Sequence, residues 1–220
     1  EQALSCIPDI VVSDVMMPIM NGITMCKMLK EDVRTSHIPI ILLTAKDSLQ
    51  DKEEGYQVGA DSYLTKPFSA TLLHSRINNL LESRKRLAER LNTNTPHHNM
   101  DEKRALLADS LNKLDNEFLE KINRLIEDRL SSEKIDIGYL ADNMCMSKST
   151  LYRKMKALTG LSTNEYVRKI KMQYAERLLL EGRYNVSEIA FRVGINSVVY
   201  FRQCFKEEFG VLPSDYLKQP

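Results

Sequence analysis

The last third of the chain contains an imperfect internal repeat, which constrains the fold more than any other feature. Four apolar positions recur at an offset of 49 residues, and seven further positions recur at an offset of 50. In each copy, a short helical pattern around a small residue (Ala141, Ala190) leads into a tight turn and then into a helix that starts at a serine and ends at a glycine. This order is typical of a helix-turn-helix. We therefore predict two such units, at about 136–160 and 186–210.

The second helix of each copy has the chemistry of a helix that reads the major groove of DNA. Such a helix needs a polar N-cap, an apolar packing face, and an outer face that can reach base edges or phosphates. The caps are Ser147 and Ser197. The predicted outward positions are Lys148, Ser149, Tyr152, Arg153 and Lys156 in the first helix and Val198, Val199, Arg202, Gln203 and Lys206 in the second.

Two valines at the start of the second helix distinguish it from the first. Since Val198 and Val199 carry no hydrogen-bonding side-chain atoms, the leading contacts of that helix are expected to be apolar ones to thymine methyl groups. A single basic helix could equally be the solvated face of an ordinary helical bundle. The duplication, with Gly160 and Gly210 in register, favours two DNA-reading helices instead.

Two long segments carry a specific pattern: MSKSTLYRKMKALTGLSTNEYVRKIKMQYAERLLLEG and NVSEIAFRVGINSVVYFRQCFKEEFGVLPSDYL. With them, the region from about 114 to 217 resembles the DNA-binding domain of AraC-type transcription factors. One departure is Ile195, where the family often has an aromatic residue. The resemblance implies base contacts at Ser149, Tyr152, Arg153, Val198, Arg202 and Gln203. Phosphate contacts are expected at Lys148, Lys156 and Lys206.

The front of the chain carries a different chemistry. Short apolar runs at 8–13, 37–44 and 61–65 alternate with helical patterns, which indicates a parallel sheet with helices on both faces. Polar residues at the carboxyl ends of parallel strands converge on one crevice. Here these residues are Asp14, Thr44 and Lys66. A carboxylate nucleophile, a hydroxyl and an ammonium group together suit an aspartyl-phosphate site.

The phrases SDVMMPIMNG around Asp14 and GADSYLTKPF around Lys66, with spacings of 30 from Asp14 to Thr44 and 52 from Asp14 to Lys66, resemble the receiver domain of bacterial response regulators. The resemblance implies a flavodoxin-like, doubly wound sheet, Asp14 as phosphoacceptor, and Tyr63 as the aromatic switch residue beside Thr44 and Lys66. A haloacid-dehalogenase-type phosphatase also uses an aspartyl nucleophile. It would need a second Asp where Met16 stands.

Part of the receiver pattern lies outside the chain. A receiver has five strands in the order 2-1-3-4-5, and its acidic Mg²⁺-binding pair follows the first strand. The chain begins without Met and too late for the first two strands, so we expect a fragment of a longer protein. Mg²⁺ is expected for the complete receiver. Here Asp14 and the backbone carbonyl of Met16 are its only expected ligands, so we predict that this chain does not bind Mg²⁺.

The middle of the chain is expected to be helical and then flexible. A heptad-like stripe at Leu73, Ile77, Leu80, Leu87 and Leu91 either packs on the sheet or forms a short dimer seam. The polar segment 92–99 reads as a linker, and its two histidines have no matching metal ligands. The predicted domains are a partial receiver at 1–85, a helical or flexible linker at 86–113, and a DNA-binding domain at 114–220.

The distribution of charged side chains follows this division into domains. Residues 1–85 carry 9 basic and 11 acidic side chains, whereas residues 130–220 carry 14 and 10, so the positive charge lies where nucleic acid is expected to bind. The four cysteines show no paired spacing and suit reduced thiols. The longest apolar run is far shorter than the roughly 20 residues of a membrane helix. We therefore expect a soluble, cytoplasmic fragment without membrane contact.

We thus predict a sequence-specific transcriptional regulator, without enzymatic activity, in which phosphorylation of Asp14 controls DNA binding. The domain order resembles the carboxyl end of hybrid two-component regulators of Bacteroides type, in which a membrane-anchored parent also carries the histidine kinase. Expected partners are double-stranded DNA, the phosphodonor kinase, a second copy of the chain and RNA polymerase. Two alternatives stay open: a free response regulator that is truncated, and a degenerate receiver that serves only as a dimerisation or interaction module.

Overall fold

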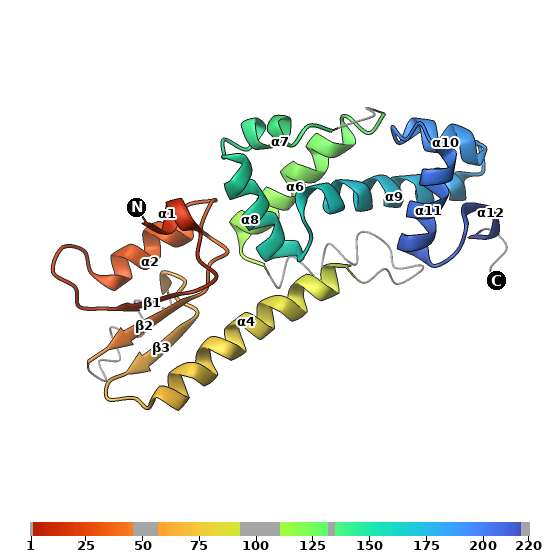
Figure 1. Cartoon of the computed structure of the whole chain (residues 1–220). Helices are drawn as coiled ribbons and strands as arrows, with labels where there is room; N and C mark the ends of the chain where they lie inside the picture. The colour runs from red at the N-terminus through yellow and green to blue at the C-terminus, as the bar shows by residue number, and fades with distance from the viewer. Residues whose placement is uncertain (1, 46–56, 93–110, 132–134, 217–220) are drawn as a thin grey trace. The chain divides into compact units, whose positions relative to one another are not determined.

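The computed structural model describes residues 2–45, 57–92, 111–131 and 135–216 (Figure 1). The chain separates into two compact units. The first contains residues 1–92, 105–116 and 153–160, and the second contains 93–104, 117–152 and 161–220. The predicted linker at 92–99 lies outside the described residues except for its first residue, Asn92. No described helix is long and apolar enough to cross a membrane.

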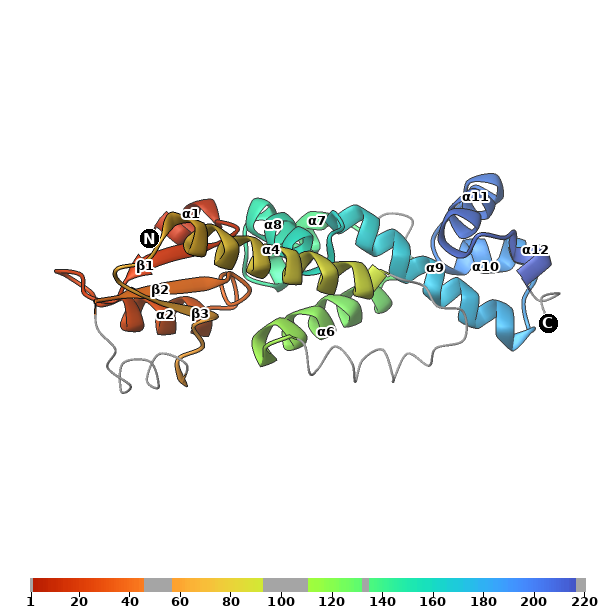
Figure 2. The same ribbon diagram turned by 90° about the horizontal axis from the view of Figure 1, so that it is seen from below.

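The first unit is built on a parallel sheet of three described strands, with β2 in the middle (Figures 1 and 2). The strands are β1 (Val11–Asp14), β2 (Ile40–Thr44) and β3 (Ser62–Thr65). Ile40, Ile41 and Leu42 of β2 are completely buried, as expected of a parallel strand covered on both faces. The alternation of strands and helices predicted from the sequence is therefore confirmed.

Three described helices accompany these strands. They are α1 (Gln2–Cys6), α2 (Gly22–Glu31) and α4 (Ala70–Asn92). One face of α2 buries Ile23, Cys26 and Leu29 against the sheet, and burial raises the pKa of the Cys26 thiol to about 11. That thiol is therefore a neutral core group.

The heptad-like stripe of α4 is only half-buried. Leu73, Ile77, Leu80 and Leu87 are each partly exposed, whereas the neighbouring Ala88 is buried. Arg84 interrupts the stripe and lies 3.7 Å from the carboxylate of Asp61, which also accepts a 2.6 Å hydrogen bond from Lys30. A dimer seam along this stripe stays a prediction.

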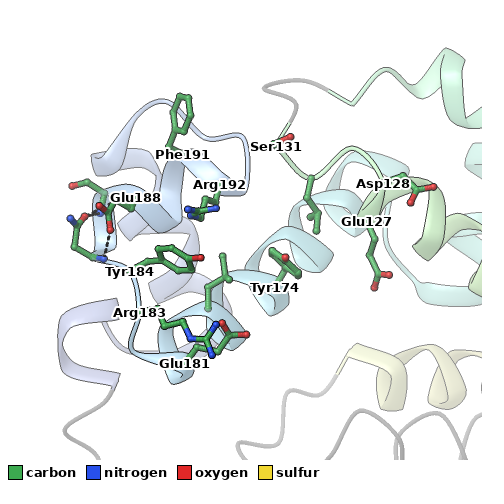
Figure 3. A pocket seen from close by; sticks show the side chains of 14 residues that line it. Glu127, Asp128, Ser131, Tyr174, Glu181, Arg183, Tyr184, Glu188, Phe191 and Arg192 are labelled. Carbon is green, nitrogen blue, oxygen red and sulfur yellow. Dashed lines mark hydrogen bonds between the residues drawn. The ribbon is translucent and has the colours of Figure 1, made fainter.

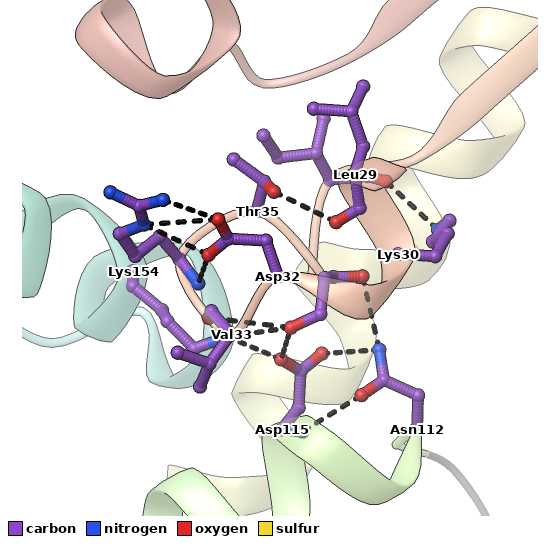
Figure 4. Close-up of polar contacts among 11 residues, drawn as sticks. Leu29, Lys30, Asp32, Val33, Thr35, Asn112, Asp115 and Lys154 are labelled. Carbon is purple, nitrogen blue, oxygen red and sulfur yellow. Dashed lines mark hydrogen bonds and ion pairs between the residues drawn. The ribbon is translucent and has the colours of Figure 1, made fainter. Parts of the chain in front are cut away.

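A buried ion pair lies inside the first unit (Figure 4). The Lys154 ammonium is 2.5 Å from the Asp115 carboxylate, and both side chains are fully buried. Ser36 links the pair, since its hydroxyl donates to Asp115 at 2.7 Å and accepts from Lys154 at 3.0 Å. The Asn112 amide donates to the other Asp115 oxygen at 2.8 Å. These hydrogen bonds offset the cost of removing both charges from water.

His37 adjoins this cluster and is neutral. Its side chain is buried, and its Nδ1 atom has no hydrogen-bond partner among the described residues. Burial, with the nearby positive charge of Lys154, lowers the pKa of His37 to about 3. The ring therefore adds no charge to the cluster at neutral pH.

The second unit is helical and contains the repeat except for residues 153–160, which belong to the first unit. The helix α9 (Thr163–Glu181) begins at a Ser162–Glu165 capping box and ends at Gly182 (Figure 2). The others are α6 (Lys113–Glu127, which begins in the first unit), α7 (Ile137–Asn143), α8 (Lys148–Thr159, shared between the units), α10 (Val186–Arg192), α11 (Val198–Phe209) and α12 (Pro213–Tyr216). The two predicted helix-turn-helix units are therefore present.

The buried ion pair yields a prediction about stability. Lys154→Met leaves the Asp115 carboxylate buried without its counter-ion, and we expect it to lower the free energy of unfolding by about 3–5 kcal/mol. The double variant Lys154→Met, Asp115→Leu should recover part of this loss, because apolar groups can replace a buried pair at little cost. Denaturant titration measures both.

The matched control is Lys156→Met, which removes the same charge from an exposed position of the same helix. We expect it to change stability by no more than about 0.5 kcal/mol. A double variant that is less stable than Lys154→Met would contradict the proposed energetics of the pair.

Candidate phosphoacceptor site and nucleic-acid interface

Asp14, Thr44 and Lys66 meet at the carboxyl edge of the sheet. Backbone hydrogen bonds align the strand ends, from Val15 to Leu43 at 2.8 Å and from Lys66 to Thr44 at 2.7 Å. The Lys66 ammonium lies 2.5 Å from the Asp14 carboxylate, and both side chains are a little over two-fifths exposed. A carboxylate that is open to solvent and paired with an ammonium can accept a phosphoryl group whose charge the ammonium then neutralises.

The loop after Asp14 folds back tightly onto the strand. Gly22 donates its amide proton to the Val15 carbonyl at 2.8 Å, and a β-carbon at Gly22 would stand only 2.2 Å from the Asp14 carbonyl oxygen. Asn21 caps α2 by accepting from the Thr24 amide at 2.7 Å. The close approach of two backbone segments therefore requires the glycine at the end of SDVMMPIMNG, and the asparagine before it supplies the helix cap.

The other two predicted receiver residues are less accessible than Asp14. Thr44 is 4% exposed, and Tyr63 packs into the apolar core that contains Cys26 and Leu29. Both lie on strands adjacent to the site, since Leu42 of β2 pairs with Tyr63 of β3. The fold therefore brings Asp14, Thr44 and Lys66 to one edge and keeps Tyr63 inside.

The described residues do not offer a site for Mg²⁺. They contain no group of three or more His, Cys, Asp or Glu side chains that could hold a metal ion. The Asp14 carboxylate already contacts Lys66, and Met16 can add only its backbone carbonyl. Mg²⁺ requires near-octahedral oxygen coordination, so these groups alone do not fit it.

The turns of the two helix-turn-helix units have the same backbone geometry. The Met146 amide donates to the Ala141 carbonyl at 2.9 Å, and the Ile195 amide donates to Ala190 at the same distance. The turn residue is left-handed in both, with φ 53° at Cys145 and 66° at Gly194. The repeat seen in the sequence is therefore a repeat of structure as well.

Both second helices expose one equivalent stripe of side chains. In α8 the exposed residues of this stripe are Ser149, Tyr152, Arg153 and Lys156, and in α11 they are Val199, Arg202, Gln203 and Lys206. Both helices are capped by their predicted serines, since Ser147 accepts from the Thr150 amide at 3.1 Å and Ser197 accepts from Tyr200 at 3.3 Å. Two solvent-facing stripes at helical spacing can each lie along a groove.

Val198 differs from the other predicted base contacts. It is partly buried and packs against the apolar cluster that contains Phe201 and Phe205. Its neighbour Val199 is 77% exposed. Lys148, at the matching position of α8, is exposed and lies near Gly138.

Arg153 is the one stripe residue whose described contacts engage backbone carbonyls far away in the sequence. Within the first unit, its guanidinium donates to the carbonyl of Cys6 at 2.7 Å and to that of Ser5 at 3.2 Å. A guanidinium that binds two carbonyls here must release them before it can bind a base.

Two family models match separate parts of the chain. Residues 2–78 match the response regulator receiver domain, and residues 140–219 match a helix-turn-helix domain. The chain joins a response regulator receiver domain to an AraC-type helix-turn-helix DNA-binding domain. Both are non-enzymatic regulator domains, as the sequence predicted.

Several known proteins resemble the chain over all or part of its length. It is 37% identical over 210 residues to "Histidine kinase P4" of Formosa agariphila, which covers 96% of this chain and 15% of that protein. It is 42% identical over 82 residues to the "DNA-binding dual master transcriptional regulator RpaA" of Synechocystis sp., covering 37% of this chain and 34% of that protein. The solved C-terminal domain of the response regulator AraT from Geobacillus stearothermophilus is 30% identical, with 46% of this chain and 84% of that chain covered and a TM-score of 0.42. The chain thus spans only 15–34% of the two curated relatives.

Sequence reasoning missed Lys154 and Asp115. Lys154 lies between the outward residues of α8, yet it is buried with Asp115 as described above. Its position three residues after Leu151 and four before Leu158 puts it on the buried stripe of α8, which was the available signal. The partner could not be found this way, because Asp115 is 39 residues distant.

A hollow of about 1090 Å³ in the second unit is lined by residues of α6, α9 and α10 (Figure 3). Two of its charged side chains already have partners. Glu188 accepts from the Asn185 amide in a capping box, and the Arg192 guanidinium lies 3.9 Å from the centre of the Tyr184 ring. We assign no ligand to this hollow.

The left-handed turn residue of the first helix-turn-helix leads to a prediction. Cys145→Gly removes the β-carbon that disfavours φ 53°, so we expect the free energy of unfolding to rise by up to about 1 kcal/mol. The reverse change in the second turn, Gly194→Ala, should lower it by about 1–2 kcal/mol. Denaturant titration measures both, and Cys145→Ala, which removes only the thiol and keeps the β-carbon, is the control. Destabilisation by Cys145→Gly would contradict the view that the β-carbon strains this turn.

Proposed function

We propose that the chain is the output end of a phosphorelay: a sequence-specific transcriptional regulator whose DNA binding is controlled by phosphorylation of Asp14. The observation that carries the proposal is the pairing of two equivalent exposed stripes, on α8 and α11, with an exposed carboxylate–ammonium pair at the end of a parallel sheet. The first feature suits the major groove, and the second suits an aspartyl phosphate.

The geometry of the site supports phosphoryl transfer to Asp14. An Asp14 carboxylate oxygen attacks phosphorus, and the bond from phosphorus to the donor's nitrogen or oxygen breaks, with its electron pair leaving on the donor. The incoming phosphoryl group lies beside the Lys66 ammonium, which compensates its negative charge. Thr44, at the end of the adjacent strand, can donate its hydroxyl to a phosphoryl oxygen.

DNA recognition uses both helix-turn-helix units. The 19 residues of α9 give a strut of roughly 28 Å at ~1.5 Å per residue, a little less than the ~34 Å turn of B-DNA. A strut of this length suits two recognition helices in successive major-groove segments on one face of the duplex. Ser149, Tyr152, Arg153, Arg202 and Gln203 are the proposed base contacts, and Lys148, Lys156 and Lys206 the proposed phosphate contacts. Val198, which the family resemblance also implies as a base contact, packs against the apolar cluster and is not kept among them.

The partners follow from the two domains. The receiver requires a phosphodonor histidine kinase, and the likeness to "Histidine kinase P4" over nearly the whole chain supports a parent that carries both. RNA polymerase is a further proposed partner of the DNA-bound regulator. The half-buried stripe of α4 supports a homodimer.

An alternative function has one observation in its favour. The described residues do not by themselves fit Mg²⁺, which receiver domains generally use, so the receiver could act only as a dimerisation or interaction module. In that case Asp14 and Lys66 form an ordinary surface ion pair.

Phosphorylation of Asp14 separates the two functions. We expect this chain, incubated with acetyl phosphate and Mg²⁺, to show little labelling by intact mass, because its own groups cannot hold the ion. A longer chain that supplies an acidic pair should be labelled stoichiometrically, and Asp14→Asn in that chain should abolish labelling. Absence of labelling in the longer chain would favour the interaction module.

DNA recognition is tested with two variants and a control. Arg153→Ala should cost about 1–3 kcal/mol on a selected site and relax specificity at one base pair. Lys206→Ala should weaken selected and random DNA alike and reduce the slope of log affinity against log salt by about 0.9. Arg183→Ala removes the same charge from an exposed position outside both stripes and should change neither. Equal losses on selected and random DNA for Arg153→Ala would contradict its role.

A further inference from the structure

We infer that Val199 reads the 5-methyl group of one thymine and thereby sets the base preference of the second half-site. The inference rests on the proposed DNA-binding function and deepens it, because it names the chemical group recognised. Val199 is not among the base contacts that the family resemblance assigns. Its assignment as a base contact follows from the rotational orientation of α11 about the helix axis.

Burial sets that rotation. Phe201, Cys204 and Phe205 are 1%, 3% and 1% exposed, so the core-facing side of α11 is known. At 3.6 residues per turn, Val199, Arg202, Gln203 and Lys206 fall within an arc of about 100° on the opposite side. Val198 falls instead on the flank of the core-facing side, and it packs against the apolar cluster there.

The internal repeat supports the same assignment independently. At the offset of 50 residues, Ser149 corresponds to Val199, and Tyr152 and Arg153 correspond to Arg202 and Gln203. Val198 corresponds to Lys148, which is proposed to contact phosphate rather than a base. Both halves therefore place the first base-reading residue at the second position of the recognition helix.

The chemistry of Val199 restricts what it can recognise. Its side chain is 77% exposed and offers two methyl groups with no donor or acceptor. In the major groove, the thymine methyl is the apolar group among otherwise polar base edges. A valine placed against a cytosine amino group or a guanine carbonyl would remove it from water without a hydrogen bond. Residues near the start of a recognition helix are those that reach base edges.

The test uses DNA that differs only by the methyl group. A preferred site is first selected from random DNA, and each thymine of the second half-site is then replaced singly by deoxyuridine. For the unmodified protein we expect one such replacement to weaken binding about four-fold, the equivalent of about 0.8 kcal/mol for one buried methyl-sized group. When that position holds cytosine, its replacement by 5-methylcytosine should strengthen binding by a similar factor.

Val199→Ala should bind the thymine site more weakly and should no longer distinguish thymine from deoxyuridine at that position. Because the side chain is exposed, the variant should fold like the parent, which circular dichroism and melting temperature check. Val198→Ala is the matched control: it removes the same atoms from the neighbouring residue and should keep the four-fold discrimination, whatever it does to stability.

Three outcomes overturn the inference. They are equal binding of thymine and deoxyuridine at every position of the second half-site, discrimination that persists in Val199→Ala, and discrimination that is lost in Val198→Ala instead. Failure to select any preferred site would refute the proposed DNA-binding function itself. The two failures are therefore distinguishable in the same experiment.

Discussion

The apolar contact between α9 and the second helix-turn-helix is the interaction on which the DNA-facing geometry depends. Met172 and Ala175 of α9, Ala190 of α10 and Phe205 of α11 are at most 1% exposed and belong to one cluster. Small residues on α9 and α10 let these two helices approach closely. The large rings of α11 pack into the space that the small residues leave in the same cluster. Since those rings cannot turn outward without leaving a cavity, the opposite stripe of α11 has one orientation towards solvent.

Two other parts of the molecule are held by different means. At the second unit, Phe205 contacts Phe209 and meets Tyr216 edge to face, with ring centres 4.5 and 5.5 Å away, which adds directional contacts to apolar packing. In the first unit, the second half of α8 is held by the buried pair of Lys154 and Asp115 with Ser36. A buried charge tolerates fewer alternative arrangements than an apolar contact, because each oxygen and proton needs its own partner.

Much of the fold was predictable because its signals are local. The 3.6-residue periodicity, the serine caps and the glycines at 160 and 210 predicted α7, α8, α10 and α11. The runs of branched apolar residues predicted three parallel strands and the meeting of Asp14 with Lys66 at their carboxyl ends. These signals concern residues within one turn, one strand or one repeat.

Other features could not be read from the sequence because they depend on contacts between distant residues. The burial of Lys154 needs Asp115 and Ser36, which come from other parts of the chain. The choice between Val198 and Val199 needs the rotation of α11, and a shift of one residue changes a side chain's direction by about 100°. Periodicity identified an outward face, but two adjacent valines at its edge could not be separated without the packed structure.

Under the proposed function, the repeat lets one architecture read two different sequences. The turns and caps of both units are equivalent, so the backbone presents the same four positions twice. The side chains at those positions differ in kind: Ser149, Tyr152 and Arg153 offer hydroxyl and guanidinium groups, whereas Val199, Arg202 and Gln203 begin with an apolar group and move the guanidinium by one residue. Because α9 joins the two helix-turn-helix units in one direction, the two sets of exposed side chains follow each other in a fixed order along the groove. A single chain of this kind therefore favours an asymmetric site, and any palindromic symmetry in a longer operator has to come from a second copy of the protein.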